Sequence, residues 1–480
     1  MKKLIQKINP ENILCLFVIL CPILDILSFA FRNKFNTTIS PSTFIRPILP
    51  IVLFVYIFFK NKFKWKMIVA SIIYLIYAII HLYLFDNLKN GISDEGILIE
   101  VQYVANYTFL IMNLFLFIYV FWKKDNEKLQ KSVLIALGIY IVSIYISILT
   151  NTSSTTYIEG TGYKGWFESG NSLCSILCLC LCIIIPMVKD KKLTLIISIL
   201  GILAGIFLAL LVGTRTGIIG FALILLLYMA ARSFINIINK LEINKKTISI
   251  SVIMIVIVAS VIIIGGSETF ERRKYINEIQ VSATDDYTGE IRHLSGDVAN
   301  LVHKIEAKEV TEEYIPKETQ RALLRLYKYA EETNLSSSDM RMQQLIYNIF
   351  LVQEQKSLPL VLFGNGYKAH FGELLLEMEV PAFLFNFGLC GFIIYFMPFL
   401  VIACYGIYFA LKHLKQIDTK YIMYLGGTWL AIALSFLSGY TFFNSSSMIF
   451  VIATYALLID KMLEINGKEV ENGENSIWNN

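Results

Sequence analysis

Charged residues are scarce in this sequence. Asp, Glu, Lys and Arg make up 16% of its 480 residues, whereas hydrophobic residues make up 56%. Soluble domains carry about 25% charged residues and few apolar runs of about 20 residues, the length at which a helix crosses a bilayer. Such runs recur along nearly the whole sequence, and the alternation typical of strands is missing. Because lipid does not tolerate open sheet edges, we predict an all-α polytopic membrane protein.

Motifs for metal, nucleotide and disulfide chemistry are also missing. All eight cysteines lie in apolar runs, which argues against disulfides and a cysteine-ligated metal. The five histidines have no metal-ligand spacing, and there is no phosphate-binding loop, dinucleotide fingerprint or G-x-S-x-G elbow. We therefore expect no metal and no cofactor. Acidic residues slightly outnumber basic ones in the long polar segment, so we expect no nucleic acid as a partner.

The apolar runs predict twelve transmembrane helices. We place them at 12–31, 44–59, 67–85, 101–122, 132–150, 171–188, 193–212, 216–231, 247–265, 381–411, 421–441 and 445–460. The run from Leu193 to Ala231 is nearly twice the length of one span. We split it at Gly213-Thr214-Arg215-Thr216, which predicts a tight turn with a charge at its tip.

The distribution of basic residues supports this split, because cytoplasmic loops of membrane proteins are rich in Lys and Arg. With both termini inside, the inside segments hold most of the basic residues. The short outside loops hold only Arg32, Lys34, Arg46, Lys89, Lys164 and Arg215. We therefore predict a multi-pass protein of the cell membrane, with cytoplasmic termini and with Arg215 at the outer face.

The same topology divides the chain into four parts. We expect transmembrane helices 1 to 9 in residues 1–265, a large extracytoplasmic loop in 266–380, helices 10 to 12 in 381–462 and a cytoplasmic tail in 463–480. The loop carries apolar residues at helical spacing. They are Leu323, Leu326, Tyr327 and Ala330, and then Met342, Leu345, Ile346, Ile349 and Phe350, with Ser338 or Asp339 as a candidate N-cap. We therefore predict a helical cap on the outer face.

Two arginines are candidates for binding an anion. Arg215 lies between two spans, where a charge is a functional candidate, and the helix that starts near Thr216 adds positive potential. Arginine suits phosphate because its planar guanidinium donates two parallel hydrogen bonds. Arg341 lies in the first turn of a predicted helix, where it opposes the helix dipole. The alternatives are a snorkelling side chain for Arg215, and for Arg341 an ion pair with Asp339 or another nearby acid.

Acidic residues gather before the tenth predicted span. The stretch from Leu362 to Phe396 contains Gly364, Gly366 and Gly372, which permit sharp turns, and then Glu373, Glu377 and Glu379. Glu373 and Glu377 are four residues apart, so we expect them to share a helical face. A glutamate at the mouth of a span can act as a general base, and His370 is a second candidate. The alternatives are ordinary interfacial acids and a structural histidine.

Taken in order, these features resemble the O-antigen ligase and polysaccharide polymerase superfamily of bacterial membrane proteins, which has about twelve spans and one large outer loop. The S-R-T-G turn of that superfamily matches Gly213–Gly217, with threonine in place of serine, and its loop arginine loosely matches Ser338–Arg341. Many members carry a His-Asn pair at a fixed distance before a G-x-x-G motif. In this sequence Gly388 to Gly391 match the G-x-x-G motif, and the residue at that fixed distance before it is Glu377. Members with Glu-Met-Asp at this place match Glu377-Met378-Glu379, which favours a carboxylate base over a histidine.

The resemblance implies an inverting glycosyltransferase that takes glycan from an undecaprenyl-pyrophosphate-linked donor without a metal. Arg215 and Arg341 would bind the pyrophosphate, and Glu377 would take the proton from the acceptor hydroxyl. The further substrate-binding candidates are Arg46, Thr214, Thr216, His370, Glu373 and Glu379, with snorkelling as the alternative for Arg46. Expected partners are the lipid-linked donor, an acceptor glycan, the bilayer and other polysaccharide-assembly proteins.

Within that enzyme class we favour a polymerase of lipid-linked repeat units, because the Glu-Met-acid variant resembles capsule and exopolysaccharide proteins. A ligase that transfers finished glycan to a lipid or cell-wall acceptor is the first alternative. A transporter or flippase of lipid-linked sugars is the second, although internal repeats typical of transporters are not evident. A membrane sensor with an outer recognition domain is the third.

Overall fold

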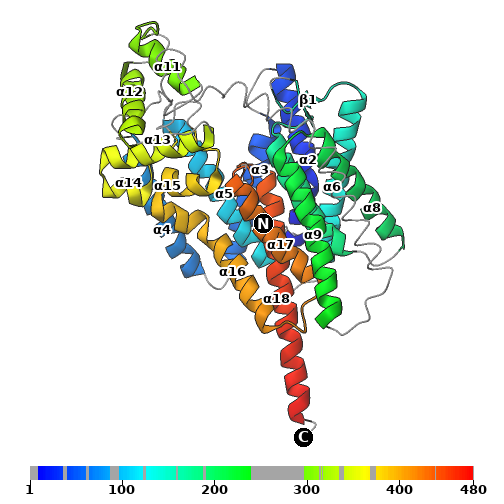
Figure 1. The fold of residues 1–480 in the computed structure, drawn as a ribbon. Coiled ribbons are helices and arrows are strands. Elements are labelled where there is room, and N and C mark those ends of the chain that lie inside the picture. The colour runs from blue at the N-terminus through cyan, green and yellow to red at the C-terminus, as the bar shows by residue number, and fades with distance from the viewer. Residues whose placement is uncertain are drawn as a thin grey trace. The chain divides into compact units, whose positions relative to one another are not determined.

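The structure is a computed structural model that describes residues 9–35, 40–60, 64–86, 97–122, 126–157, 160–187, 191–238, 297–312, 315, 317–333, 340–367, 375–437 and 439–478. In this part of the chain nearly all regular structure is helical (Figure 1). Nine helices there are long and apolar enough to cross a membrane, and one bent pair of helices brings the number of candidate spans to ten. The predicted all-α polytopic membrane fold is confirmed.

The first eight predicted spans each coincide with a candidate membrane helix. These helices are α2 (Pro10–Phe35), α3 (Pro41–Lys60), α4 (Lys64–Asp86), α5 (Ile97–Phe121), α6 (Glu127–Leu149), α7 (Gly170–Ile184) with the 3-10 turn η1 (Ile185–Met187), α8 (Lys191–Ile206) with the π-helical turn η2 (Phe207–Leu211), and α9 (Arg215–Ile238). Isoleucines along α4 face outward, among them Ile68, Ile72 and Ile79, as expected of a helix in contact with lipid.

The last four predicted spans match the structure to different degrees. The span 247–265 lies outside the described residues. The span 381–411 is the bent pair α15 (Glu379–Tyr395) and α16 (Met397–Lys412), and the span 421–441 is α17 (Thr419–Leu437). The span 445–460 is the first half of α18 (Ser447–Trp478), which continues into a charged segment. The total of twelve spans stays a prediction.

The chain forms two compact units. The first unit comprises Met1–Lys62, Phe109–Thr269 and Pro398–Asn480, and the second comprises Phe63–Thr108 and Phe270–Met397. The helix α5 therefore contributes its first half to the second unit and its second half to the first. The four predicted parts of the chain are sequential, whereas these units are interleaved along it.

The first unit packs around α7, whose residues are buried except for Asn171. Helices α6, α9, α17 and α18 contact it, and α9 lies beside α17 (Figure 1). Small residues allow this close packing: a Cβ at Gly220 would lie 2.7 Å from the Cys178 sulfur, and one at Gly427 would lie 3.2 Å from Cys182 Cβ. All eight cysteines are free thiols, and those of α7 serve as small packing residues.

The second unit contains the helices of the predicted cap. They are α11 (Asp297–Glu306), α12 (Lys317–Glu332), α13 (Met340–Gln355) and the short α14 (Leu358–Phe363). The helices α11 to α13 share an apolar core that includes the predicted Leu323, Leu326, Ala330, Ile346 and Phe350. Met342, predicted on the same face, is instead 45% exposed. Three amphipathic helices thus bury their apolar faces against one another.

A break in α15 interrupts the predicted span 381–411. Gly388 has φ +69°, a left-handed conformation that interrupts the helix, and α15 and α16 are bent by 48° at Phe396. The break is filled by the turn 364–366: Asn365 N donates to Phe385 O at 2.9 Å, and Gly366 N donates to Asn386 O at 2.9 Å. The Gly-Asn-Gly sequence therefore satisfies carbonyls that a continuous helix would have used itself.

A substitution at this break tests the arrangement. Gly388→Ala should destabilise the protein by about 2 kcal/mol or more, because the added Cβ has an unfavourable φ and meets Gly364 N and Leu362 O. Gly138→Ala is the control, since no atom lies within 4 Å of its added Cβ and alanine favours the helix. The measurement is thermal unfolding of the detergent-solubilised variants. Equal midpoints for both variants would contradict the assigned backbone conformation.

Candidate active site

Arg215 begins α9 at the tip of the predicted turn. The chain reverses at Gly213, which has φ +71°, and α9 starts two residues later. Thr214 caps the helix, because its Oγ1 accepts a hydrogen bond from Gly217 N at 3.1 Å. Thr214 and Thr216 are buried, whereas Arg215 is exposed. Among the residues that the structure describes, no acidic side chain pairs with Arg215. Its guanidinium and the amide groups of the helix start thus form a positively charged surface.

The two glycines around Arg215 hold this turn in place. A Cβ at Gly217 would lie 2.6 Å from Leu208 O, so only glycine lets α9 approach η2 this closely. The hairpin of β1 (Ser154–Thr155) and β2 (Tyr163–Gly165) lies against the other side, where a Cβ at Gly162 would lie 2.5 Å from Val212 O. Thr216 also donates to Asn171 Oδ1 at 3.3 Å, which ties α9 to the start of α7. The threonine and glycine pattern therefore positions an otherwise exposed arginine.

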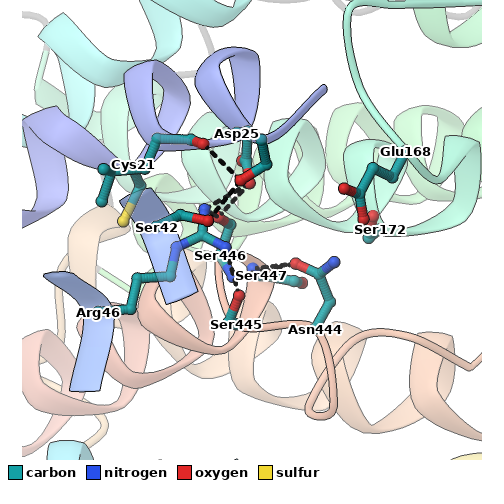
Figure 2. Close-up of polar contacts among 12 residues, drawn as sticks. Cys21, Asp25, Ser42, Arg46, Glu168, Ser172, Asn444, Ser445, Ser446 and Ser447 are labelled. Atoms are coloured by element: carbon teal, nitrogen blue, oxygen red, sulfur yellow. Dashed lines mark hydrogen bonds and ion pairs between the residues drawn. The ribbon is translucent and has the colours of Figure 1, made fainter. Parts of the chain in front are cut away.

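Arg46 lies in a polar cluster of the first unit rather than reaching freely into solvent (Figure 2). Its Nη2 lies 2.5 Å from Asp25 Oδ1 and donates to Ser446 Oγ at 2.7 Å, while Nη1 donates to Ser445 Oγ at 2.5 Å. Asp25 also accepts from Tyr140 at 2.7 Å and from Ser446 Oγ at 2.8 Å. The Arg46 and Asp25 side chains are only 16% and 18% exposed.

The contacts of Arg46 limit what it can do for a substrate. Its charge is already compensated by Asp25, so snorkelling does not describe it. Its buried Nε has no hydrogen-bond acceptor within the described residues, so this N–H can donate to a further ligand. The cluster joins α2, α3 and α6 to the start of α18, where Asn444 Oδ1 accepts from Ser446 N and Ser447 N at 3.0 Å.

Arg341 and Glu377 form an ion pair in the second unit. Arg341 Nε lies 3.3 Å from Glu377 Oε2, and the two side chains are 38% and 43% exposed. The sequence allowed an ion pair of Arg341 with Asp339 or another nearby acid, and Glu377 is one such acid. A second contact fixes the backbone, because Glu377 N donates to Gln344 Oε1 at 3.1 Å, one turn along α13 from Arg341. The candidate base and one candidate phosphate ligand are therefore adjacent.

The prediction that Glu373 and Glu377 share a helical face is wrong, because Glu377 is not in a helix. This residue lies in a non-helical segment before α15. Pro381 explains the boundary, because its ring would clash with the carbonyl of residue 377 if the helix continued upstream. Glu379 is buried at the first position of α15, where a carboxylate is favoured by the helix dipole.

Several predicted positions lie outside the described residues. They are His370, Gly372, Glu373, Ser338 and Asp339. Within the described residues, no three His, Cys, Asp or Glu side chains lie close enough together to hold a metal. A reaction without a metal stays a prediction.

Sequence reasoning missed three titratable residues, namely the partly buried Asp25 and the fully buried His81 and Glu100. Asp25 and His81 each interrupt an apolar run, whereas Glu100 directly precedes one, and their partners come from other helices. His81 Nε2 lies 2.7 Å from Glu100 Oε1, and both side chains are fully buried. Because a buried charge needs a compensating partner, each lone ionisable residue in a span was a signal that a second one should be sought.

The family model of O-antigen ligase like membrane proteins matches residues 8–465. The chain belongs to this family. The match covers nearly the whole sequence and includes both the Arg215 turn and the Arg341–Glu377 pair. Among curated proteins none matches the chain significantly. Membership of the O-antigen ligase-like family gives the chain a role in processing glycans at the membrane, with a lipid-linked glycan as substrate.

The Asp25–Arg46 pair can be tested by removing one or both partners. Asp25→Ala should cost about 3 kcal/mol, because it leaves a largely buried guanidinium without its counter-charge. Asp25→Ala combined with Arg46→Leu should recover part of that loss, because the unpaired charge is gone. The measurement is the unfolding midpoint in detergent, with Lys131→Ala as the control for an exposed pair. A double variant less stable than Asp25→Ala would contradict compensation as the role of Asp25.

Proposed function

We propose that this protein is a polymerase that joins lipid-linked oligosaccharide repeat units of a cell-surface glycan. The donor would be an undecaprenyl-pyrophosphate-linked glycan, and the acceptor a hydroxyl group of a second glycan. The observation that carries the proposal is the Arg341–Glu377 pair, a cation and a carboxylate held 3.3 Å apart and open to solvent. Arg215, on the first turn of a membrane helix, supplies a second cation.

The arginines would act on the leaving group. As the bond between the anomeric carbon and the phosphate oxygen breaks, negative charge develops on the pyrophosphate. Guanidinium groups donate paired hydrogen bonds to phosphate oxygens, and the α9 N-terminus adds its amide groups at Arg215. Charge stabilisation of this kind typically contributes several kcal/mol to a transition state. Thr214 and Thr216 would support Arg215, and Arg46 would reach a phosphate through its remaining donor or by exchanging a serine contact.

Glu377 would be the general base. It would take the proton of the acceptor hydroxyl as the acceptor oxygen bonds to the anomeric carbon from the face opposite the pyrophosphate, which inverts that carbon. In the absence of substrate, the exposed Arg341 ion pair is worth no more than about 1 kcal/mol. A pyrophosphate can therefore compete for Arg341, and donor binding would free Glu377 for the acceptor. His370, Glu373 and Glu379 remain candidates for contacts to the glycan.

The arrangement fits the rival functions less well. A ligase would use the same donor chemistry and differ in its acceptor, so it stays the closest alternative. A flippase forms no glycosidic bond and therefore needs no general base such as the one proposed for Glu377. We expect the large loop and Arg215 on the outer face and the termini in the cytoplasm, which suits an acceptor delivered from outside.

Two substitutions test the proposed roles. Arg215→Ala should lower the transfer rate by about 10²-fold or more because charge stabilisation is lost, and Glu377→Gln by about 10²- to 10⁴-fold because the base is lost. The measurement is glycan transfer by purified protein in proteoliposomes supplied with lipid-linked donor. Both side chains are exposed, so the unfolding midpoints should change little.

Arg232→Ala is the matched control, since Arg232 is an exposed arginine near the other end of the same helix. It should keep wild-type transfer. If Arg215→Ala and Glu377→Gln both keep full activity, the assigned site is wrong.

The product distribution separates polymerase from ligase. With a purified lipid-linked repeat unit as both donor and acceptor, a polymerase yields a ladder of products that differ by one repeat. A ligase consumes donor only when a different acceptor is added. Movement of the intact donor across the bilayer, without formation of a new glycosidic bond, would support the flippase.

A further inference from the structure

The second unit contains a fully buried acid–base pair that the proposed transfer reaction does not use. His81 on α4 and Glu100 on α5 are each 0% exposed, and His81 Nε2 lies 2.7 Å from Glu100 Oε1. Both residues also contact backbone. His81 Nδ1 lies 2.6 Å from Phe363 O, and Tyr367 N donates to Glu100 Oε2 at 2.7 Å. The pair thus touches both ends of the turn 363–367.

These contacts determine how many protons the pair holds. A carbonyl oxygen only accepts hydrogen bonds, so His81 Nδ1 must carry the proton that is donated to Phe363 O. The amide of Tyr367 only donates, so Glu100 Oε2 must accept. One further proton then lies between Nε2 and Oε1, and the net charge of the pair is zero whichever atom carries it. Each of the two His81 ring nitrogens and each of the two Glu100 carboxylate oxygens therefore has a hydrogen-bond partner, as burial requires.

The turn held by this pair fits its surroundings tightly. A Cβ at Gly366 would meet the Phe85 ring and would lie 3.1 Å from the Glu100 carboxyl carbon. Tyr367 stacks on Tyr103 with ring centroids 3.6 Å apart. Since Asn365 and Gly366 donate their amides to the break in α15, a displacement of the turn would also displace the first half of that helix.

The same turn is connected to the Arg341–Glu377 pair by two routes. Asn365 Nδ2 donates to Asn348 Oδ1 on α13, the helix that carries Arg341, at 3.2 Å. The first half of α15 begins at Glu379, two residues after Glu377. The position of the carboxylate relative to the guanidinium therefore depends on the turn, and the turn depends on His81 and Glu100.

We propose that His81 and Glu100 are positioning residues, which set the geometry of Glu377 and Arg341 by clamping the turn 363–367. The inference rests on the proposed function in that Glu377 is taken as the base. The clamp works through hydrogen bonds rather than through a charge on Glu100. A carboxamide can replace the carboxylate, because its oxygen accepts from Tyr367 N and its amino group donates to His81 Nε2.

The experiment compares Glu100→Gln with Glu100→Ala and His81→Ala in proteoliposomes supplied with lipid-linked donor. Glu100→Gln should keep at least half of the wild-type kcat. The two alanine variants should lose about 10- to 100-fold in kcat, because a small displacement of a catalytic group has effects of this size. The donor KM should rise by a smaller factor than kcat falls, because Arg341 is displaced but Arg215, the other proposed pyrophosphate ligand, is untouched.

A control separates positioning from general loss of stability. Tyr421→Phe deletes a buried hydrogen bond, from the Tyr421 hydroxyl to Gly406 O at 2.6 Å, in the first unit. It should lower the unfolding midpoint and leave kcat per folded molecule unchanged. If Glu100→Ala keeps wild-type kcat, or if Glu100→Gln is as inactive as Glu100→Ala at equal amounts of folded protein, the proposal is overturned.

Hydrogen exchange provides a readout that does not depend on activity. The amides of Asn365, Gly366, Tyr367 and Glu377 should exchange at least tenfold faster in Glu100→Ala, and at the wild-type rate in Glu100→Gln. Unchanged exchange in Glu100→Ala would overturn the clamp. Faster exchange in Glu100→Ala together with no glycan transfer by the wild-type protein would refute the proposed function and leave the clamp standing.

Discussion

A charged or polar group inside an apolar helical protein must find a partner, and the rest of this structure depends on that constraint. In a low-dielectric environment an unpaired charge costs several kcal/mol, more than one packing contact returns. Asp25 and Arg46 satisfy the constraint by pairing across two helices, and His81 and Glu100 satisfy it by sharing one proton. Arg215 satisfies it differently, because its side chain is exposed at a helix start.

The constraint separates groups with structural roles from groups available for chemistry. The buried pairs have their hydrogen bonds directed at protein atoms, which suits them to holding helices and turns. Arg215 is exposed, and the partly exposed Arg341–Glu377 ion pair is weak enough for a substrate to replace. Glycines with positive φ connect the two sets: Gly213 presents Arg215, and Gly388 opens α15 for the turn that His81 and Glu100 hold.

Much of the fold could be predicted from the sequence, because span length and the distribution of basic residues act locally. The turn at Arg215 was predicted because the apolar run from Leu193 to Ala231 is too long for one helix. The apolar faces of the cap helices were predicted from the helical spacing of their apolar residues. The break at Gly388 could not be predicted in this way, because its freed carbonyls are paired with residues twenty positions upstream. The expectation that Glu373 and Glu377 share a helical face failed at Glu377, because Pro381 prevents α15 from continuing upstream.

The sequence identified residues of the candidate site but not the contacts between them. Arg341 and Glu377 were both singled out, but their pairing depends on the packing of α13 against the segment before α15, which no local pattern encodes. His81, Glu100 and Asp25 were missed for the same reason, since each has its partner on another helix.

The most direct measurement of the central claim is the balance between donor cleavage and bond formation in purified protein. Wild-type protein should release one polyprenyl pyrophosphate for each new glycosidic bond, and Glu377→Gln should bind donor but release almost none. Release of polyprenyl pyrophosphate by Glu377→Gln at the wild-type rate would contradict the account.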